Sequence, residues 1–186
     1  VNSEGVSSRY LILAYHDLFS IEYLKRRLAG YWTMETSSFS ELLSIAVREK
    51  KALEEECARF DSELMDDAER VGGQEYADLC AGAFRQAVAA HKLVADVEGR
   101  PLFFSKENFS NGCIATVDVT YPSAPLFLLC QPELMKGMLI PILDYAESRF
   151  WKFPFAPHDL GTYPLANGQV YGGGEEMEKN QMPVEE

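Results

Sequence analysis

The sequence predicts a mainly α-helical protein built from antiparallel helical hairpins, with one small β-hairpin. A capping motif at Ser38–Glu41 opens a long run of apolar residues with helical spacing, which ends at Gly72 and Gly73. A second apolar helical stripe follows at once, from Gln74 to about Asp96. The period then changes, and residues 93–105 indicate two short strands joined by a glycine turn.

The N-terminal part carries shorter patterns. Residues 10–15 form an apolar run that fits either a strand or a buried entry segment. Ser20 precedes residues 21–28, whose pattern predicts a short amphipathic helix closed by Gly30. His16 and Asp17 lie in the loop between the two segments, and we interpret them as a capping or surface pair.

The two long helices joined by Gly72 and Gly73 predict an αα-hairpin. A first helix of about 32 residues, rising about 1.5 Å each, would be about 48 Å long. A coiled coil is the competing interpretation, but the apolar seam is short and lacks regular Leu or Ile. Cys57 and Cys80 fall on the apolar faces, so we expect buried free thiols, with a disulfide left open. His91 lies beside the second stripe and is expected to be a hydrogen-bonded core histidine rather than a ligand.

The C-terminal half is less regular. Residues 106–112 form a polar loop, and residues 116–122 lead into Ala124–Cys130, a mostly apolar segment that we expect to be buried. Pro132 suits the first turn of a helix reaching about Ser148, which Pro141 should bend or split. An acidic tail follows Gly172–Gly174.

Residues 153–168 predict an ordered loop that could carry a site. Three prolines and two glycines in this segment favour one fixed backbone shape. The loop also carries His158, Asp159, Tyr163 and Asn167, and rigid loops with such side chains often form sites. A structural turn with a silent His158 is the alternative interpretation.

Composition excludes several function classes. The net charge of −12 argues against binding nucleic acid or an anionic membrane through a basic face. No apolar run approaches the roughly 18 residues of a membrane-spanning helix. The four cysteines contain no Cys-x-x-Cys pair, which argues against a zinc knuckle or a dithiol redox centre. We expect neither a cofactor nor a metal.

The motifs of several catalytic classes are missing. The sequence contains no Gly-x-Ser-x-Gly elbow, Ser-x-x-Lys, His-Glu-x-x-His or phosphate-binding loop motif. Carboxylates are therefore the most plausible catalytic groups, because two of them in different environments can divide acid and base roles. The candidates in loops or at loop edges are Glu107, Asp118, Asp159, Glu185 and Glu186.

Four segments in one order carry a family resemblance. They are Lys106–Gly112, Thr116–Pro122, Ala156–Pro164 and Met182–Glu186, and residues 10–17 and 90–93 fit as well. Together these segments resemble the glutaminase A family of bacteria and fungi, specifically its six-helical-hairpin domain.

The resemblance implies a fold and a reaction. It implies part of an (α/α)6 toroid like that of six-hairpin glycosidases, with residues 1–186 as one domain that is the N-terminal part of the toroid. The remaining C-terminal part of the same domain would then be a partner. The family hydrolyses L-glutamine to L-glutamate and ammonia, and its members are secreted or exported, which implies a secreted or periplasmic protein.

Three hypotheses follow for the site. In the first, Asp159, Glu185 or Glu186 activates water to hydrolyse glutamine, and His158, Tyr163, Asn167, Glu107, Asn108 and Asp118 bind the substrate. In the second, two carboxylates flank a sugar that stacks on Trp151, Phe155 or Tyr163, as in a glycoside hydrolase. In the third, the chain is a non-catalytic helical scaffold or binding domain.

Overall fold

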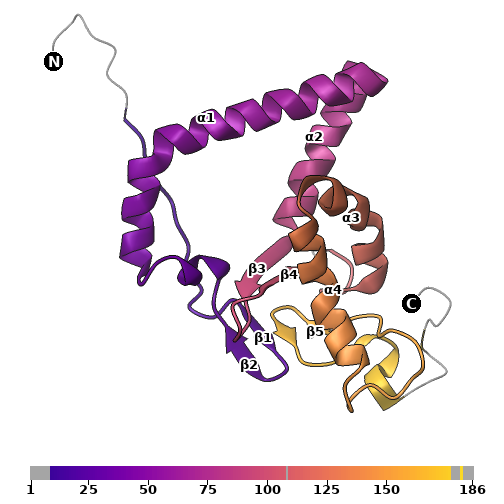
Figure 1. Cartoon of the computed structure of the whole chain (residues 1–186). Helices are drawn as coiled ribbons and strands as arrows, with labels where there is room; N and C mark the ends of the chain where they lie inside the picture. Colours follow the sequence, from indigo (N-terminus) through magenta and orange to yellow (C-terminus); the bar gives the residue numbers. More distant parts are fainter. Residues whose placement is uncertain (1–8, 108, 177–180, 182–186) are drawn as a thin grey trace, which may run out of the picture.

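The computed structural model describes residues 9–107, 109–176 and 181. The predicted fold class is confirmed, since the described part has four α-helices, arranged as two helical hairpins, and a small β region (Figure 1). Its strands form a four-stranded sheet in the order β2-β1-β6-β5 and a separate hairpin, β3-β4.

The predicted helix at residues 21–28 is wrong. These residues form β1 (Ile21–Tyr23) and β2 (Arg26–Leu28), an antiparallel pair in which Ile21 faces Leu28. Ile21 and Tyr23 are both buried, so the segment buries every second residue, as a strand does. Leu24 and Lys25 have positive φ angles of 46° and 66°, which suit the two-residue turn of a hairpin.

The apolar run at residues 10–15 is neither a strand nor buried. Within the described residues it has no secondary structure, and Leu11, Leu13 and Tyr15 are strongly exposed. His16 then stacks on Phe39, and Asp17 accepts a hydrogen bond from Ser20 and pairs with Lys92.

The long helical hairpin is confirmed, although its second helix ends at Ala89 and not near Asp96 as predicted. After a short 3-10 helix (η1, Tyr31–Met34), α1 (Phe39–Gly72) begins at Ser38, whose Oγ accepts a hydrogen bond from the Glu41 amide at 3.1 Å. Gly73, at φ 80°, joins α1 to α2 (Gln74–Ala89). Figure 1 shows the two helices diverging from this turn, so much of α1 lies away from the remaining elements.

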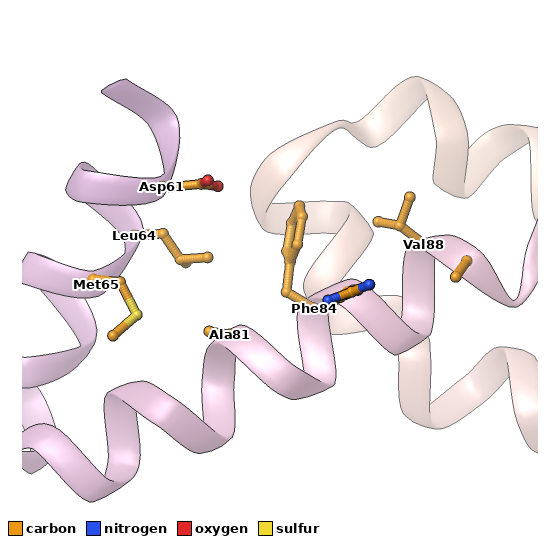
Figure 2. A pocket seen from close by; sticks show the side chains of 8 residues that line it. Asp61, Leu64, Met65, Ala81, Phe84 and Val88 are labelled. Atoms are coloured by element: carbon orange, nitrogen blue, oxygen red, sulfur yellow. The ribbon is translucent and has the colours of Figure 1, made fainter. Parts of the chain in front are cut away.

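The apolar face of the hairpin is largely uncovered. Between the two helices lies a pocket of about 610 Å³, lined mainly by Leu64 and Met65 of α1 and by Ala81, Phe84 and Val88 of α2, as Figure 2 shows. Cys57 on the same face is exposed, Cys80 is half-buried, and both are free thiols. The expectation that these two thiols are buried is therefore wrong, because no described element packs over Cys57 on α1 and Cys80 on α2 is only partly covered.

The core lies where the β3–β4 hairpin meets α4. β3 (His91–Ala95) and β4 (Pro101–Ser105) form the predicted hairpin. α3 (Val117–Cys130) is a helix despite Pro122 and Pro125, and α4 (Pro132–Ala146) runs through Pro141 and packs on β4. His91 is buried between Phe103 and Phe127, as expected for a core histidine.

The proline-rich loop is ordered, as predicted. It contains β5 (Gly161–Thr162) and β6 (Leu165–Ala166), and a 3-10 segment (η2, Tyr171–Glu176) follows. β6 pairs in parallel with β1, so one sheet unites strands from the two ends of the chain. Among the described residues, no helix combines the length and apolar character needed to cross a membrane.

Candidate functional site

Asp159 lies at the centre of a buried polar cluster. Its carboxylate is fully buried and accepts hydrogen bonds from the backbone N–H groups of Gly161, Val170 and Tyr171 at 2.8–3.1 Å. His158 Nδ1 lies 3.0 Å from Asp159 Oδ2. These four contacts compensate for the removal of the carboxylate from water.

His158 is held from several directions. Because an ionised carboxylate only accepts hydrogen bonds, Nδ1 carries the proton that is donated to Asp159. The His158 backbone N–H donates to Gln169 Oε1 at 2.6 Å, and its carbonyl oxygen accepts from the Val117 amide at 2.9 Å. The ring stacks on Tyr171, with the ring centroids 4.1 Å apart. The tautomer and orientation of the imidazole are therefore fixed.

Asp118 connects this buried pair to the surface. It lies in the first turn of α3, where a negative charge is favoured by the helix dipole. Its Oδ2 is 4.0 Å from His158 Nε2, and 47% of the Asp118 side chain is exposed, against 5% for His158. The three side chains form a carboxylate–imidazole–carboxylate series that starts in the interior and ends at solvent.

Glu107 and Cys113 border the same cluster. Glu107 Oε1 accepts a hydrogen bond from Thr116 Oγ1 at 2.7 Å. Cys113 is buried, and its pKa is raised to about 12, chiefly by burial and then by the charges of Asp159 and Glu107. Its sulfur is therefore a neutral thiol at physiological pH and not a thiolate nucleophile.

Cys113, His158 and Asp159 are the group in the described part that could hold a metal ion, with ligand atoms within 4.8 Å of one another. Metal binding needs a thiolate and accessible carboxylate oxygens. Here both oxygens of Asp159 already accept two hydrogen bonds each, and the raised pKa of Cys113 opposes loss of its proton. The arrangement favours a hydrogen-bonded cluster over a metal centre.

Two of the predicted substrate-binding residues, Asn167 and Tyr163, do not lie beside His158 and instead make contacts that hold the fold together. Asn167 Oδ1 accepts from the Lys25 amide at 2.7 Å, and its Nδ2 donates to Glu22 at 2.8 Å, so it fastens the loop to the β1–β2 turn. Tyr163 is half-buried against the core, with the Lys106 ammonium over its ring. The remaining predicted site residues, Asn108, Glu185 and Glu186, lie outside the described residues.

Sequence reasoning missed three residues of the cluster: Cys113, Gln169 and Tyr171. Cys113 is a lone cysteine, and nothing in its neighbourhood marks it as part of a site. Gln169 and Tyr171 follow directly after the proline-rich loop. Both lie within three residues of the end of that loop, and no spacing rule singles them out.

Two family models match this chain. A family model described as the glutaminase A six helical-hairpin domain matches residues 73–186, and one for a domain of unknown function (DUF5127) matches residues 1–67. The two matches meet close to the turn between α1 and α2.

Two curated relatives carry glutaminase names. Glutaminase A of Aspergillus oryzae is 39% identical over 128 residues, which cover 68% of this chain and 18% of that protein. A probable glutaminase of Arthroderma benhamiae is 34% identical over 129 residues, which cover 69% of this chain and 14% of that protein. The chain thus spans less than a fifth of the length of each. No solved structure matches the chain.

The matched range from residue 73 contains α2, the β3–β4 hairpin, α3, α4 and the cluster of Asp118, His158 and Asp159. The chain therefore belongs to the glutaminase A family and carries part of its six helical-hairpin domain.

Proposed function

We propose that the full-length protein hydrolyses the side-chain amide of L-glutamine to L-glutamate and ammonia. Membership of the glutaminase A family supports this reaction class. The observation that assigns the reaction to particular residues is the series Asp118–His158–Asp159. Its solvent end, at His158 Nε2 and Asp118, is suited to proton transfer.

In this proposal His158 Nε2 accepts a proton from water as the water oxygen attacks the amide carbon. The resulting imidazolium then gives that proton to the leaving nitrogen, the C–N bond breaks, and ammonia departs. Asp159 keeps its negative charge throughout, because its role is to fix Nδ1–H and to stabilise the imidazolium. Asp159 therefore acts through His158 and does not itself touch water.

Asp118 is the exposed member and takes the part nearest the substrate. Its carboxylate can stabilise the imidazolium or accept a hydrogen bond from the substrate ammonium group. The Tyr171 ring is stacked on the His158 ring, so substrate entry in this mechanism requires the Tyr171 ring to move aside. Glu185 and Glu186 stay predictions as further acidic groups.

The test is ammonia release from L-glutamine by the full-length protein. We expect Asp118→Asn to lower kcat by about 10²-fold or more, the low end of the usual contribution of a positioned acid–base group. Glu133→Gln is the matched control, since Glu133 also lies in the first turn of a helix, is 61% exposed against 47% for Asp118, and pairs with Lys136 away from His158. Equal activity of Asp118→Asn and the control would refute the assigned site, and absence of ammonia release from the unmodified protein would refute the reaction.

The carbohydrate hypothesis has less support from the described residues. Trp151 is buried in the main core cluster, and Phe155 packs beside it, with Phe153 stacked on Phe155. These rings are therefore engaged in packing and do not offer a flat surface to a sugar. L-Glutamine remains the preferred substrate.

We further propose that the full-length protein is secreted or periplasmic, as the family resemblance implies. The same ammonia assay tests this when it is run on the culture medium, the periplasmic fraction and the cell extract. Activity confined to the cell extract would contradict it. The partner proposed here is the remaining part of the same domain, which would cover the apolar face of α1 and α2.

A further inference from the structure

A second pocket, away from the His158 cluster, combines both signs of charge. It measures about 360 Å³ and lies between the β1–β2 turn, the β3–β4 turn and the end of α4. We call it the hairpin pocket. Its polar lining consists of Tyr23, Arg26, Asp96, Glu98, Arg100 and Asp144.

Arg100 is fixed in this pocket by a buried carboxylate. Its Nε donates to Asp96 Oδ2 at 2.6 Å, and the Asp96 side chain is only 8% exposed. Asp96 Oδ1 in turn accepts the backbone N–H groups of Glu98 and Arg100, each at 2.8 Å. The Arg100 side-chain hydrogen bond that is described uses Nε, so the two terminal nitrogens of the guanidinium can still donate to a planar carboxylate.

The opposite charge comes from Asp144 on α4. Asp144 interacts with the Tyr23 hydroxyl and, through its charge, with Arg100. Tyr23 is buried, and its hydroxyl lies 3.4 Å from the Pro141 carbonyl oxygen. Burial and the Asp144 charge raise the pKa of Tyr23 above its ordinary value, so its hydroxyl stays protonated. Asp144 thus contributes a carboxylate to the pocket lining beside the buried Tyr23.

The backbone beside the pocket is strained. Leu24 lines the pocket, and Leu24 and Lys25 hold left-handed φ angles that residues other than glycine rarely adopt. The turn keeps this shape because the Leu24 amide donates to the Ala166 carbonyl and the Lys25 amide to Asn167. These contacts hold the hairpin turn, and with it this wall of the pocket, in one shape.

From this arrangement we propose that the hairpin pocket binds the head group of a free α-amino acid. The carboxylate would lie on Arg100 and Arg26, and the ammonium group on Asp144. A simple anion would meet the carboxylates of the pocket, and a simple cation would meet its arginines, whereas a zwitterion satisfies both. The volume lies within the range of small-molecule sites. This inference does not depend on glutamine hydrolysis.

The test is calorimetric titration of the full-length protein with three matched probes. L-Alanine carries both charges, propionate lacks the ammonium group, and ethylamine lacks the carboxylate, and none of them is a substrate for amide hydrolysis. We expect measurable binding of L-alanine and at least fivefold weaker binding of each single-charge analogue.

Variants then assign the binding to this pocket. Arg26→Gln and Asp144→Asn should each weaken L-alanine binding by about fivefold, which corresponds to the loss of about 1 kcal/mol for one exposed charged contact. Arg27→Gln is the control, because Arg27 is the neighbouring residue of β2, pairs with Glu22 and lines a different pocket. No binding of L-alanine at 10 mM, equal binding of propionate, or equal effects of Arg26→Gln and Arg27→Gln would each overturn the proposal.

Discussion

Two buried polar residues, Asp159 and His91, are satisfied to different degrees. Each oxygen of the Asp159 carboxylate accepts two hydrogen bonds. His91 Nδ1 donates to the Ala87 carbonyl oxygen at 2.6 Å, whereas Nε2 has no partner among the described residues. A buried imidazole in this setting is stable only when neutral, because its protonated form would carry an uncompensated charge.

Stability should therefore depend on pH through His91. Burial lowers the pKa of His91, and the hydrogen bond to Ala87 opposes this effect. The nearby Lys106 charge lowers the pKa further, so the net shift is downward. Above the unfolded pKa of about 6.5 both states are neutral and His91 adds no pH dependence. As the pH falls below that value, the unfolded state gains the proton first, so the free energy of unfolding decreases until the lower folded pKa is passed.

The measurement is the urea midpoint of full-length protein between pH 7.5 and 5.5. We expect His91→Phe, which keeps a ring between Phe103 and Phe127, to lose part of the decrease seen in the unmodified protein. The same substitution at the exposed His16 is the control. An unchanged slope in His91→Phe would show that His91 does not contribute.

At the scale of elements, α4 approaches β4 closely because residue 137 has no side chain. A Cβ atom at Gly137 would lie 2.8 Å from the Pro101 carbonyl oxygen and 3.2 Å from the Phe103 amide nitrogen. Both neighbours are backbone atoms of a paired strand and cannot move aside cheaply. This contact determines how the helix sits on the hairpin.

Gly137→Ala should destabilise the protein by about 1–3 kcal/mol, the usual cost of overpacking, even though alanine favours a helix. Gly82→Ala in α2 is the matched control, because a Cβ there meets nothing within 4 Å. That control should be neutral or stabilising by up to about 1 kcal/mol. Urea unfolding of the two variants measures the difference, and equal effects would contradict the close contact.

The elements that the sequence predicted are those with local signals. The Ser38–Glu41 capping motif, the glycine turn after α1 and the β3–β4 hairpin all occur where expected. The strands β1 and β2 were not predicted, because residues 21–28 fit a helical pattern as well as an alternating one. The strand that pairs with β1, β6, is distant in the chain, so no local signal marks the sheet. In the site, the His158–Asp159 pair was predicted, whereas Gln169 and Cys113 reach it only through tertiary folding.

At the scale of the whole molecule, the α1–α2 hairpin presents apolar residues that the described part leaves uncovered. Leu53 and Phe60 are exposed on α1, and Leu79 is exposed on α2. Exposed apolar surface of this extent is typical of an interface. It is consistent with the proposal that the rest of the domain packs against this face.

Cys57, on the same face between Leu53 and Phe60, can report that packing. The proposal is that the rest of the domain covers α1 and leaves the end of α3, where Cys130 lies, open. In full-length protein we therefore expect the Cys57 thiol to react with a maleimide at least tenfold more slowly than the Cys130 thiol. Variants that retain a single cysteine allow each rate to be measured. Fast labelling of Cys57 would show that the face stays open.

The parallel pairing of β1 with β6 has a consequence for biosynthesis. Glu22 pairs with Leu165, so the β1–β2 hairpin must wait until residue 165 has been synthesised before its sheet can be completed. Contacts so distant in sequence form slowly, because a long loop must close first. Until then the β1–β2 edge is unpaired, and a nascent chain stalled before residue 165 is the species in which chaperone binding at this edge is expected.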